Sequence, residues 1–201
     1  MALRPIITLP DAKLRMTSDK IAKVDASVRT LLDDMIETMY DAPGIGLAAV
    51  QIGVLSRALV LDTAGKDEPP KPMFLVNPEI LSASPERIVY EEGCLSIPDY
   101  YEDVERPEKI RVRFLDRDGA ECELDAEGIL AIAIQHEIDH LNGVLFIDHI
   151  SRLKRDRVTR KFAKAARKAA EEGKPFDPRE GERALRERKP PHRPDQAETT
   201  A

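Results

Sequence analysis

The segment EGILAIAIQHEIDHLNG, residues 127–143, limits the possible folds of this chain more than any other stretch. Its apolar residues recur at helical spacing and cover most of the circumference of a helix: Ile129, Leu130, Ala133, Ile134, Ile138 and Leu141. The pair Asn142 and Gly143 predicts the end of this helix. A helix that is apolar on so many sides must be buried, so we expect it at the centre of the fold.

The remaining segments predict one helix at each end of the chain and strands between them. Residues 25–40 have apolar side chains at helical spacing, with Asp25 as a candidate N-cap. Residues 41–53, rich in Pro and Gly, are expected to form a loop or tight turn. Strands are expected within residues 58–62, 73–78, 86–96 and 110–115. The DRDG turn after the last of these predicts a hairpin with a partner strand that contains Cys122 and Leu124. The predicted fold class is α+β, with antiparallel β-sheets packed around the central HExxH helix and flanked by N-terminal and C-terminal helices.

Charge is distributed unevenly along the 201 residues. Residues 1–150 contain 15 Lys and Arg against 28 Asp and Glu, a net charge of −13, whereas residues 151–201 have a net charge of +7. We therefore expect a catalytic domain over 1–150, a basic C-terminal helix over 151–172, and a Pro- and charge-rich tail over 173–201 that is largely disordered. The basic helix either contacts a polyanion or is only a solvated surface.

The chain has few features of a membrane or secreted protein. No apolar run approaches the roughly 18 residues of a membrane span. Prolines and charges interrupt the N-terminal apolar stretch, and two cysteines provide no disulfide framework. We expect a cytoplasmic protein without membrane contact, and a monomer by default.

The HExxH pattern within the central helix is typical of a hydrolytic metal site. His136 and His140 stand four residues apart, so both project from one face and can reach one ion. Glu137 lies about 100° further round the helix, where its carboxylate can exchange protons with a reacting water.

The third metal ligand does not follow from the HExxH helix alone. The three-histidine version of the motif would need a histidine where this chain has Phe146. His149 is out of register with that motif and is interpreted as a surface or capping residue. Cys94 is the better candidate, because it follows Gly93 at a strand end where the backbone can approach a ligand closely. Cys122, within a hairpin strand, is interpreted as an inert thiol.

Three separated segments together resemble the motifs of the peptide deformylase family: GIGLAAVQ at 44–51, EGCLS at 92–96 and QHEIDH at 135–140. The resemblance extends over roughly residues 3–165. It implies an enzyme that removes the N-formyl group from the N-terminal formyl-methionine of nascent polypeptides and releases formate.

The resemblance also implies the roles of the site residues. The metal ligands would be Cys94, His136 and His140, and Glu137 would be the general acid and base for a water activated by the metal. Gln51 and the backbone N–H of Leu95 would stabilise the oxyanion. The implied ion is Fe(2+), one per chain, and thiolate with imidazole also suits Zn, Ni or Co.

The family's pocket positions correspond to an apolar slot suited to a methionine side chain: Gly44, Ile45, Gly46, Tyr90, Glu92, Gly93, Ile129, Ala133 and His136. The GIGLA backbone is expected to pair with an extended substrate by strand addition. The chain departs from familiar relatives at Tyr100 and Tyr101, where a basic residue often binds the distal part of the peptide. Arg106 and Asp139 are expected to pair across to the metal helix.

In the bacterial branch of the family a basic C-terminal helix docks on the ribosome, and residues 151–170 resemble that helix. The candidate contacts are Arg152, Lys154, Arg155, Arg160, Lys161 and Lys164. Other functions remain open at this point: an HExxH metallopeptidase with a His or Glu third ligand, a non-enzymatic relative that binds ribosomes or RNA, or a diverged metal-dependent amidase.

Overall fold

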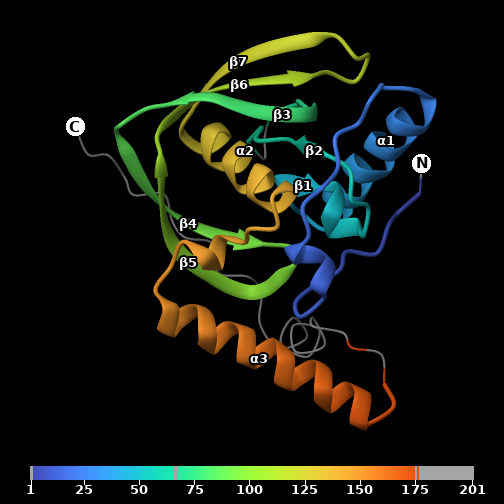
Figure 1. Cartoon of the computed structure of the whole chain (residues 1–201), viewed down its shortest axis with the longest axis vertical. Coiled ribbons are helices and arrows are strands. Elements are labelled where there is room, and N and C mark those ends of the chain that lie inside the picture. Colours follow the sequence, from blue (N-terminus) through green and yellow to red (C-terminus); the bar gives the residue numbers. More distant parts are fainter. Residues whose placement is uncertain (1, 66–67, 175, 177–201) are drawn as a thin grey trace.

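The predicted central helix is α2, Gly128–Leu141, and it lies between two antiparallel sheets in the computed structural model (Figure 1). The structure describes residues 2–65, 68–174 and 176. The larger sheet has five strands in the order β1-β2-β3-β6-β7: Gly46–Ala48, Ala58–Leu61, Met73–Ala83, Lys109–Leu115 and Glu121–Glu127. The smaller sheet pairs β4, Arg87–Cys94, with β5, Ile97–Pro107. These elements confirm the predicted α+β class.

The five-stranded sheet is covered on both faces in its middle. In β2, Leu59 belongs to the apolar cluster with α2, whereas the next residue, Val60, belongs to the cluster with helix α1, Ala26–Asp41. All four residues of β2 are buried, which is expected for a strand that is covered on both sides. Asp25 caps α1 as predicted, because its side chain accepts hydrogen bonds from the first turn of the helix.

The expectation of a loop or turn over 41–53 was only partly correct. Strand β1 and the 3-10 helix η2, Ala49–Ile52, occupy half of this segment. A three-residue strand is too short to produce a period-two pattern, and β1 is defined by its pairing with β2. The turn itself is confined to the residues just before Gly46, where Pro43 has a positive φ of 25°.

Strand β5 was not predicted. Its central positions alternate exposed and buried, but one of the buried residues is Arg106, so the hydrophobic alternation that predicts strands is broken. Val104 is the only buried apolar side chain in the second half of the strand. Pairing with β4 along its whole length, from Cys94 to Arg87, fixes β5 in the structure.

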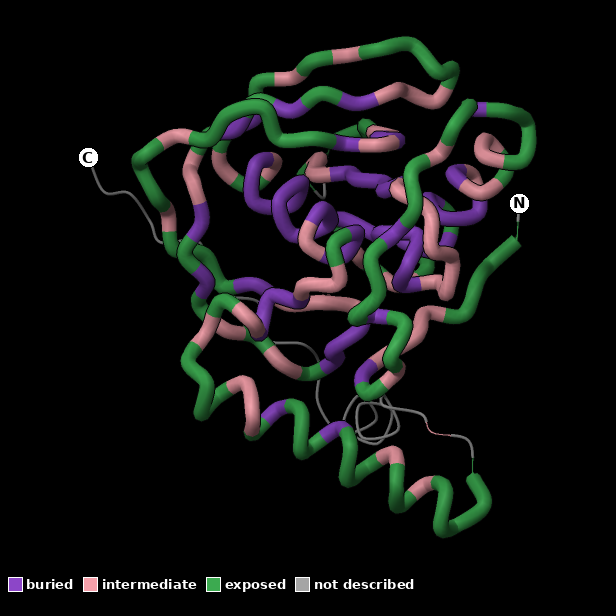
Figure 2. Tube along the Cα trace, in the orientation of Figure 1, coloured by how far each residue is buried: buried purple, intermediate pink, exposed green. Residues whose placement is uncertain are grey.

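Helix α3, Arg152–Glu171, begins after the N-cap Ser151, in the segment where the sequence predicted a basic helix. It contacts the body through Val158 and Phe162, which join a third apolar cluster with Phe146 of η3, Phe146–Asp148. Most of α3 is exposed, in contrast to the buried α2 (Figure 2).

No helix in the described part of the chain is both long and apolar enough to span a membrane. The disordered tail expected over 173–201 falls largely on residues 175 and 177–201, which lie outside the described residues.

Two leucines of β3 test the packing of α2 on the sheet. Leu75 is fully buried in the cluster with α2, whereas Leu81 on the same strand is 37% exposed. We expect Leu75→Ala to lower the free energy of unfolding by about 3 kcal/mol, because it opens a cavity in the core. Leu81→Ala is the matched control and should cost less than about 1 kcal/mol. Equal losses in urea unfolding would contradict the assigned packing.

Candidate active site

Cys94, His136 and His140 meet at one point although they come from two different elements. Cys94 ends β4, and the two histidines lie one turn apart on α2. The ligand atoms of the three side chains all lie within 4.8 Å of one another. Each histidine is almost fully buried and Cys94 is half-buried. The structure thus brings together the three residues that the sequence singled out as metal ligands.

The ring of His136 is oriented by a buried carboxylate. Its Nδ1 lies 2.8 Å from Oε2 of Glu92, which leaves Nε2 to face the other two ligand atoms. Burial acts to raise the pKa of Glu92, but hydrogen bonds from His136 and Arg106 outweigh it and hold this pKa below its usual value. Glu92 is therefore an anion that fixes the position of the His136 imidazole.

Arg106 links Glu92 to the metal helix. Its Nε and Nη2 donate to Glu92 at 2.5 and 3.0 Å, and its Nη1 donates to Asp139 at 2.8 Å. The expected pair between Arg106 and Asp139 is confirmed. His149 Nε2 lies 2.7 Å from the same Asp139 oxygen, so this histidine ends the network. It lies outside the group of Cys94, His136 and His140, which we call the metal cluster. Removing one partner of such a buried pair typically costs about 3–5 kcal/mol.

His140 is suited to metal binding in its neutral form. Its Nε2 lies 3.2 Å from Sγ of Cys94, and its Nδ1 is buried with no hydrogen-bond partner among the described residues. Burial lowers the pKa of His140 well below its usual value. The neutral imidazole is the form that coordinates metal ions.

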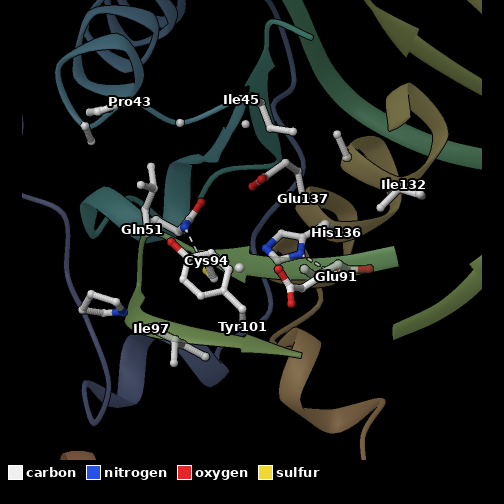
Figure 3. A pocket seen from close by; sticks show the side chains of 18 of the residues that line it. Pro43, Ile45, Gln51, Glu91, Cys94, Ile97, Tyr101, Ile132, His136 and Glu137 are labelled. Carbon is white, nitrogen blue, oxygen red and sulfur yellow. Dashed lines mark hydrogen bonds and ion pairs between the residues drawn. The ribbon is translucent and has the colours of Figure 1, made fainter. Parts of the chain in front are cut away.

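Glu137 is buried beside the ligands and is not part of their network. Its side chain is 4% exposed, and its Oε2 has no hydrogen-bond partner in the described part of the chain. The carboxylate points into the cavity in Figure 3. Burial raises the pKa of Glu137 to about 7 in the metal-free site, and a bound cation would lower it. Near this value a carboxyl group can both accept and release a proton at neutral pH.

Gly46 is required beside Glu137. A Cβ atom at Gly46 would lie 2.5 Å from Oε1 of Glu137, closer than any tolerated contact. The absence of a side chain in β1 therefore lets the backbone of the five-stranded sheet approach the acid directly.

Gln51 presents an amide to the metal cluster. Its Oε1 accepts from the backbone N–H of Ala48 at 2.8 Å, which fixes the orientation of the amide. Its Nε2 then lies 3.6 Å from Sγ of Cys94 and 3.2 Å from Oγ of Ser96. Leu95 follows Cys94 in the turn between β4 and β5 and lines the same cavity. Gln51 thus lies beside Cys94, and Leu95 lines the adjoining cavity.

A cavity of about 640 Å³ opens next to these residues. All of the pocket positions named from the sequence line it: Gly44, Ile45, Gly46, Tyr90, Glu92, Gly93, Ile129, Ala133 and His136. Sequence reasoning missed several further lining residues, chiefly because they depend on the unpredicted β5 and on the end of α1: Asp41, Ala42, Pro43, Glu91, Ile97, Pro98, Asp99 and Ile132. Tyr101, noted only as a departure, also lines the cavity, whereas Tyr100 donates to Glu102 elsewhere.

The donor set fits a divalent transition-metal ion. One thiolate and two imidazoles are ligands for Fe, Zn, Ni or Co rather than for Mg or Ca, which prefer oxygen. Three protein ligands leave room for water, as catalytic sites require. A buried acid and an oriented amide beside such a site are suited to hydrolysis of a carbonyl compound.

Comparisons with known proteins agree with this site. The family described as "Polypeptide deformylase" matches residues 3–156. The chain is 61% identical over 170 residues to a peptide deformylase of Mesorhizobium japonicum, covering 85% of this chain and 97% of the relative. The crystal structure of peptide deformylase from Ehrlichia chaffeensis has a TM-score of 0.79 at 42% identity, covering 84% of this chain and 99% of that one. A Met-Ala-Ser-bound class I type b peptide deformylase from Acinetobacter baumannii has a TM-score of 0.71 at 33% identity, covering 74% and 99%.

The two cysteines provide a direct test of the metal cluster. Cys94 lies within it, whereas Cys122 lies outside it in β7 and its thiol donates to Asp116. We expect Cys94→Ala to weaken zinc affinity by about 100-fold or more, because it removes one of three ligands. Competition with a chromogenic chelator measures this change. Cys122→Ala should keep the affinity of the parent protein, and a similar loss in both variants would contradict the assignment.

Proposed function

As a member of the polypeptide deformylase family, the chain is a metal-dependent hydrolase that removes the N-formyl group from nascent polypeptides, and we propose which of its residues perform this reaction. The observation that carries the proposal is the meeting of Cys94, His136 and His140 beside the buried Glu137, whose Oε2 has no partner among the described residues. These three ligands would hold the ion. When bound, a divalent ion lowers the pKa of water and polarises the formyl carbonyl.

Glu137 would move the protons of the reaction. It would accept a proton from the attacking water as the oxygen adds to the formyl carbon. It would then donate this proton to the amide nitrogen as the C–N bond breaks, so that water and the formyl-peptide give formate and a free amine. Burial, which raises the pKa of Glu137, and an unpartnered Oε2 that faces the cavity support a carboxyl group that can serve in both directions.

Gln51 and Leu95 would stabilise the charge that develops on the formyl oxygen. The amide of Gln51 is held by Ala48, so its N–H groups need no reorganisation during the reaction. The backbone N–H of Leu95 follows the ligand Cys94 in a tight turn. Each such preorganised donor typically contributes about 3 kcal/mol to transition-state binding.

The methionine side chain of the substrate would enter the cavity. Ile129 and Ala133 lie four residues apart on α2 and line the cavity. Together with Ile45, which precedes β1, they give an apolar surface for an unbranched thioether. The rest of the peptide would extend between the two sheets. Strand β1 is at the edge of the five-stranded sheet and β4 is at the edge of the two-stranded sheet. Residues of both edge strands line the cavity, which supports binding of the peptide by strand addition.

We propose Fe(2+) as the native ion, one per chain, with Zn, Ni or Co able to substitute. The family resemblance supports iron, and the thiolate and imidazole ligands accept all four. We further propose that the enzyme acts as a cytoplasmic monomer with three parts: a catalytic domain over 1–150, the basic helix over 151–172 and a tail over 173–201. Its substrates are nascent polypeptides, and their synthesis in the cytoplasm supports the proposed cytoplasmic location.

Formate release from formyl-Met-Ala-Ser by protein prepared anaerobically with Fe(2+) tests the assigned roles. We expect turnover of this peptide and none of acetyl-Met-Ala-Ser. Glu137→Gln should lower kcat by about 100- to 10,000-fold, because the proton carrier is lost. The variant should still bind one equivalent of metal, measured separately. A Glu137→Gln variant with parental kcat would exclude this acid from proton transfer.

We also propose that the basic helix α3 contacts the ribosome. Val158 and Phe162 fix one face of α3 on the body, and Arg160 and Lys164 are about 200° away on the opposite, exposed face. A basic exposed face next to an otherwise acidic domain supports contact with RNA phosphates.

Charge reversal distinguishes ribosome contact from a merely solvated helix. We expect Arg160→Glu with Lys164→Glu to weaken cosedimentation with ribosomes by about 10-fold or more, and to reduce the salt dependence of binding. Reversal of Lys20 and Lys23, exposed residues outside α3, is the matched control and should have a small effect. Parental binding by the α3 variant would support the solvated-helix alternative.

A further inference from the structure

Consecutive residues from Asp41 to Gly46 form one continuous part of the cavity wall, which we call the 41–46 segment. The segment connects the end of α1 to strand β1, and Figure 3 shows Pro43 and Ile45 at the cavity. Strand β1 is the edge strand along which the extended peptide is proposed to bind. The position of the 41–46 segment therefore determines where the backbone of a bound peptide can lie.

The 41–46 segment has little packing of its own to hold it in place. None of its first five residues, all of them described, is buried. Between the cap of α1 and strand β1, the N–H of Gly44 donates to the carbonyl of Met39 at 3.0 Å. The carbonyl of Ile45 accepts from the N–H of Asp62 at 2.9 Å. A segment with so few buried contacts opens easily unless neighbouring elements fix it.

Asp62 provides a fixed point for this segment. It directly follows β2, and the residue is only 8% exposed. Its carboxylate accepts from the hydroxyl of Tyr40 at 2.6 Å, and from the backbone N–H groups of Ala64 and Lys71 at 2.9 Å each. Asp62 thus holds Ile45 through its backbone and the last turn of α1 through its side chain. Both ends of the exposed turn are fixed by one residue.

The hydrogen bond between Tyr40 and Asp62 joins a neutral donor to an ionised acceptor. Burial and the nearby carboxylate raise the pKa of Tyr40 to about 12, so the hydroxyl keeps its proton at neutral pH. Burial acts to raise the pKa of Asp62, but hydrogen bonds from Tyr40, Ala64 and Lys71 outweigh it and hold this pKa below its usual value. A bond to an ionised acceptor is stronger than one between two neutral groups.

We propose that Tyr40 is a positioning residue of the enzyme, whose hydrogen bond to Asp62 holds the 41–46 segment where it binds the backbone of the formyl-peptide. The inference rests on the proposed function, in which the peptide extends along β1. Tyr40 is not among the described residues that line the cavity, so it acts through Asp62 and the segment. Without this hydrogen bond, part of the binding free energy is spent on ordering the segment, and peptide binding is weakened.

The chemical step is separate from this effect. His136, Glu137 and His140 lie on α2, and Cys94 ends β4. Strand β1, which approaches Glu137 at its first residue, is held independently by its pairing with β2. Loss of the Tyr40 hydroxyl therefore changes peptide binding and leaves the reacting groups in place.

Tyr40→Phe tests the proposal in the enzyme prepared anaerobically with Fe(2+). We expect KM for formyl-Met-Ala-Ser to rise about 10-fold while kcat stays within about twofold, because the lost interaction serves the bound peptide and the transition state equally. Partial unfolding alone would lower the apparent kcat and leave KM unchanged, since KM does not depend on the concentration of active enzyme. A parental KM in Tyr40→Phe would overturn the inference.

Tyr100→Phe is the matched control. Tyr100 also donates its hydroxyl to a carboxylate, that of Glu102 at 3.0 Å, and it is not among the described residues that line the cavity. This variant should keep the parental KM. An equal rise of KM in both variants would overturn the assignment to Tyr40, because the rise would then follow from the loss of either phenol hydrogen bond.

A double-mutant cycle assigns the effect to the bond between Tyr40 and Asp62. We expect Asp62→Asn to raise KM as well, because it removes the charge of the acceptor. Adding Tyr40→Phe to Asp62→Asn should raise KM by less than about twofold more, because the two changes remove the same interaction. A full further 10-fold rise would mean that Tyr40 acts independently of Asp62 and would overturn the proposed route.

Hydrogen exchange tests the inference without any substrate. The amide of Gly44 should exchange about 10-fold faster in Tyr40→Phe than in the parental protein or in Tyr100→Phe, measured by mass spectrometry on fragments that contain the 41–46 segment. Unchanged exchange in Tyr40→Phe would overturn the inference.

The outcomes separate this inference from the proposed function. Turnover of formyl-Met-Ala-Ser with a parental KM in Tyr40→Phe would overturn the inference while leaving deformylation intact. If the parental protein turns over no formyl-peptide, the proposed function fails, and calorimetric binding of the peptide Met-Ala-Ser decides the inference. Binding about 10-fold weaker in Tyr40→Phe supports the positioning role. Equal affinities overturn it.

Discussion

The structure depends on how charged groups are accommodated in a helix that is otherwise apolar. Burying an ionised side chain without a partner costs several kcal/mol, yet α2 carries four ionisable residues within positions 136–140 near its end. Glu92 and Arg106 meet this cost from β4 and β5, because together they satisfy His136 and Asp139. The two-stranded sheet is therefore more than a cover over α2. It supplies the polar partners of two of these four residues.

The same arrangement explains why the ligands come from two elements. Cys94 ends the strand that also carries Glu92, so the strand that orients His136 also delivers the thiol. Gly93 between them gives β4 a position without a side chain, over which Tyr101 of β5 lies. On the opposite side, Gly46 lets β1 approach Glu137. On both sides of the site a glycine thus leaves room for a neighbouring side chain, Tyr101 at Gly93 and Glu137 at Gly46.

The sequence predicted most of the elements and the residues of the metal cluster, for physical reasons. In α1, α2 and β6 the buried side chains are mostly apolar. Their helical or alternating spacing can therefore be recognised in the sequence. Strand β5 was missed because one of the two buried positions in its second half is held by Arg106, a charged residue that only tertiary partners make compatible with burial. Strand β1 was missed because three residues display no period, and its existence depends on pairing with β2.

The cavity wall was harder to predict than the metal cluster, and the difference has functional meaning. His136, Glu137 and His140 lie on one rigid helix, where their spacing fixes their relative positions. Asp41, Glu91 and Asp99 come from a helix end and two strands, and only the assembled fold brings them to one cavity. None of these three touches the buried network around His136 through its side chain. Their charge can therefore change while the orientation of His136 is maintained.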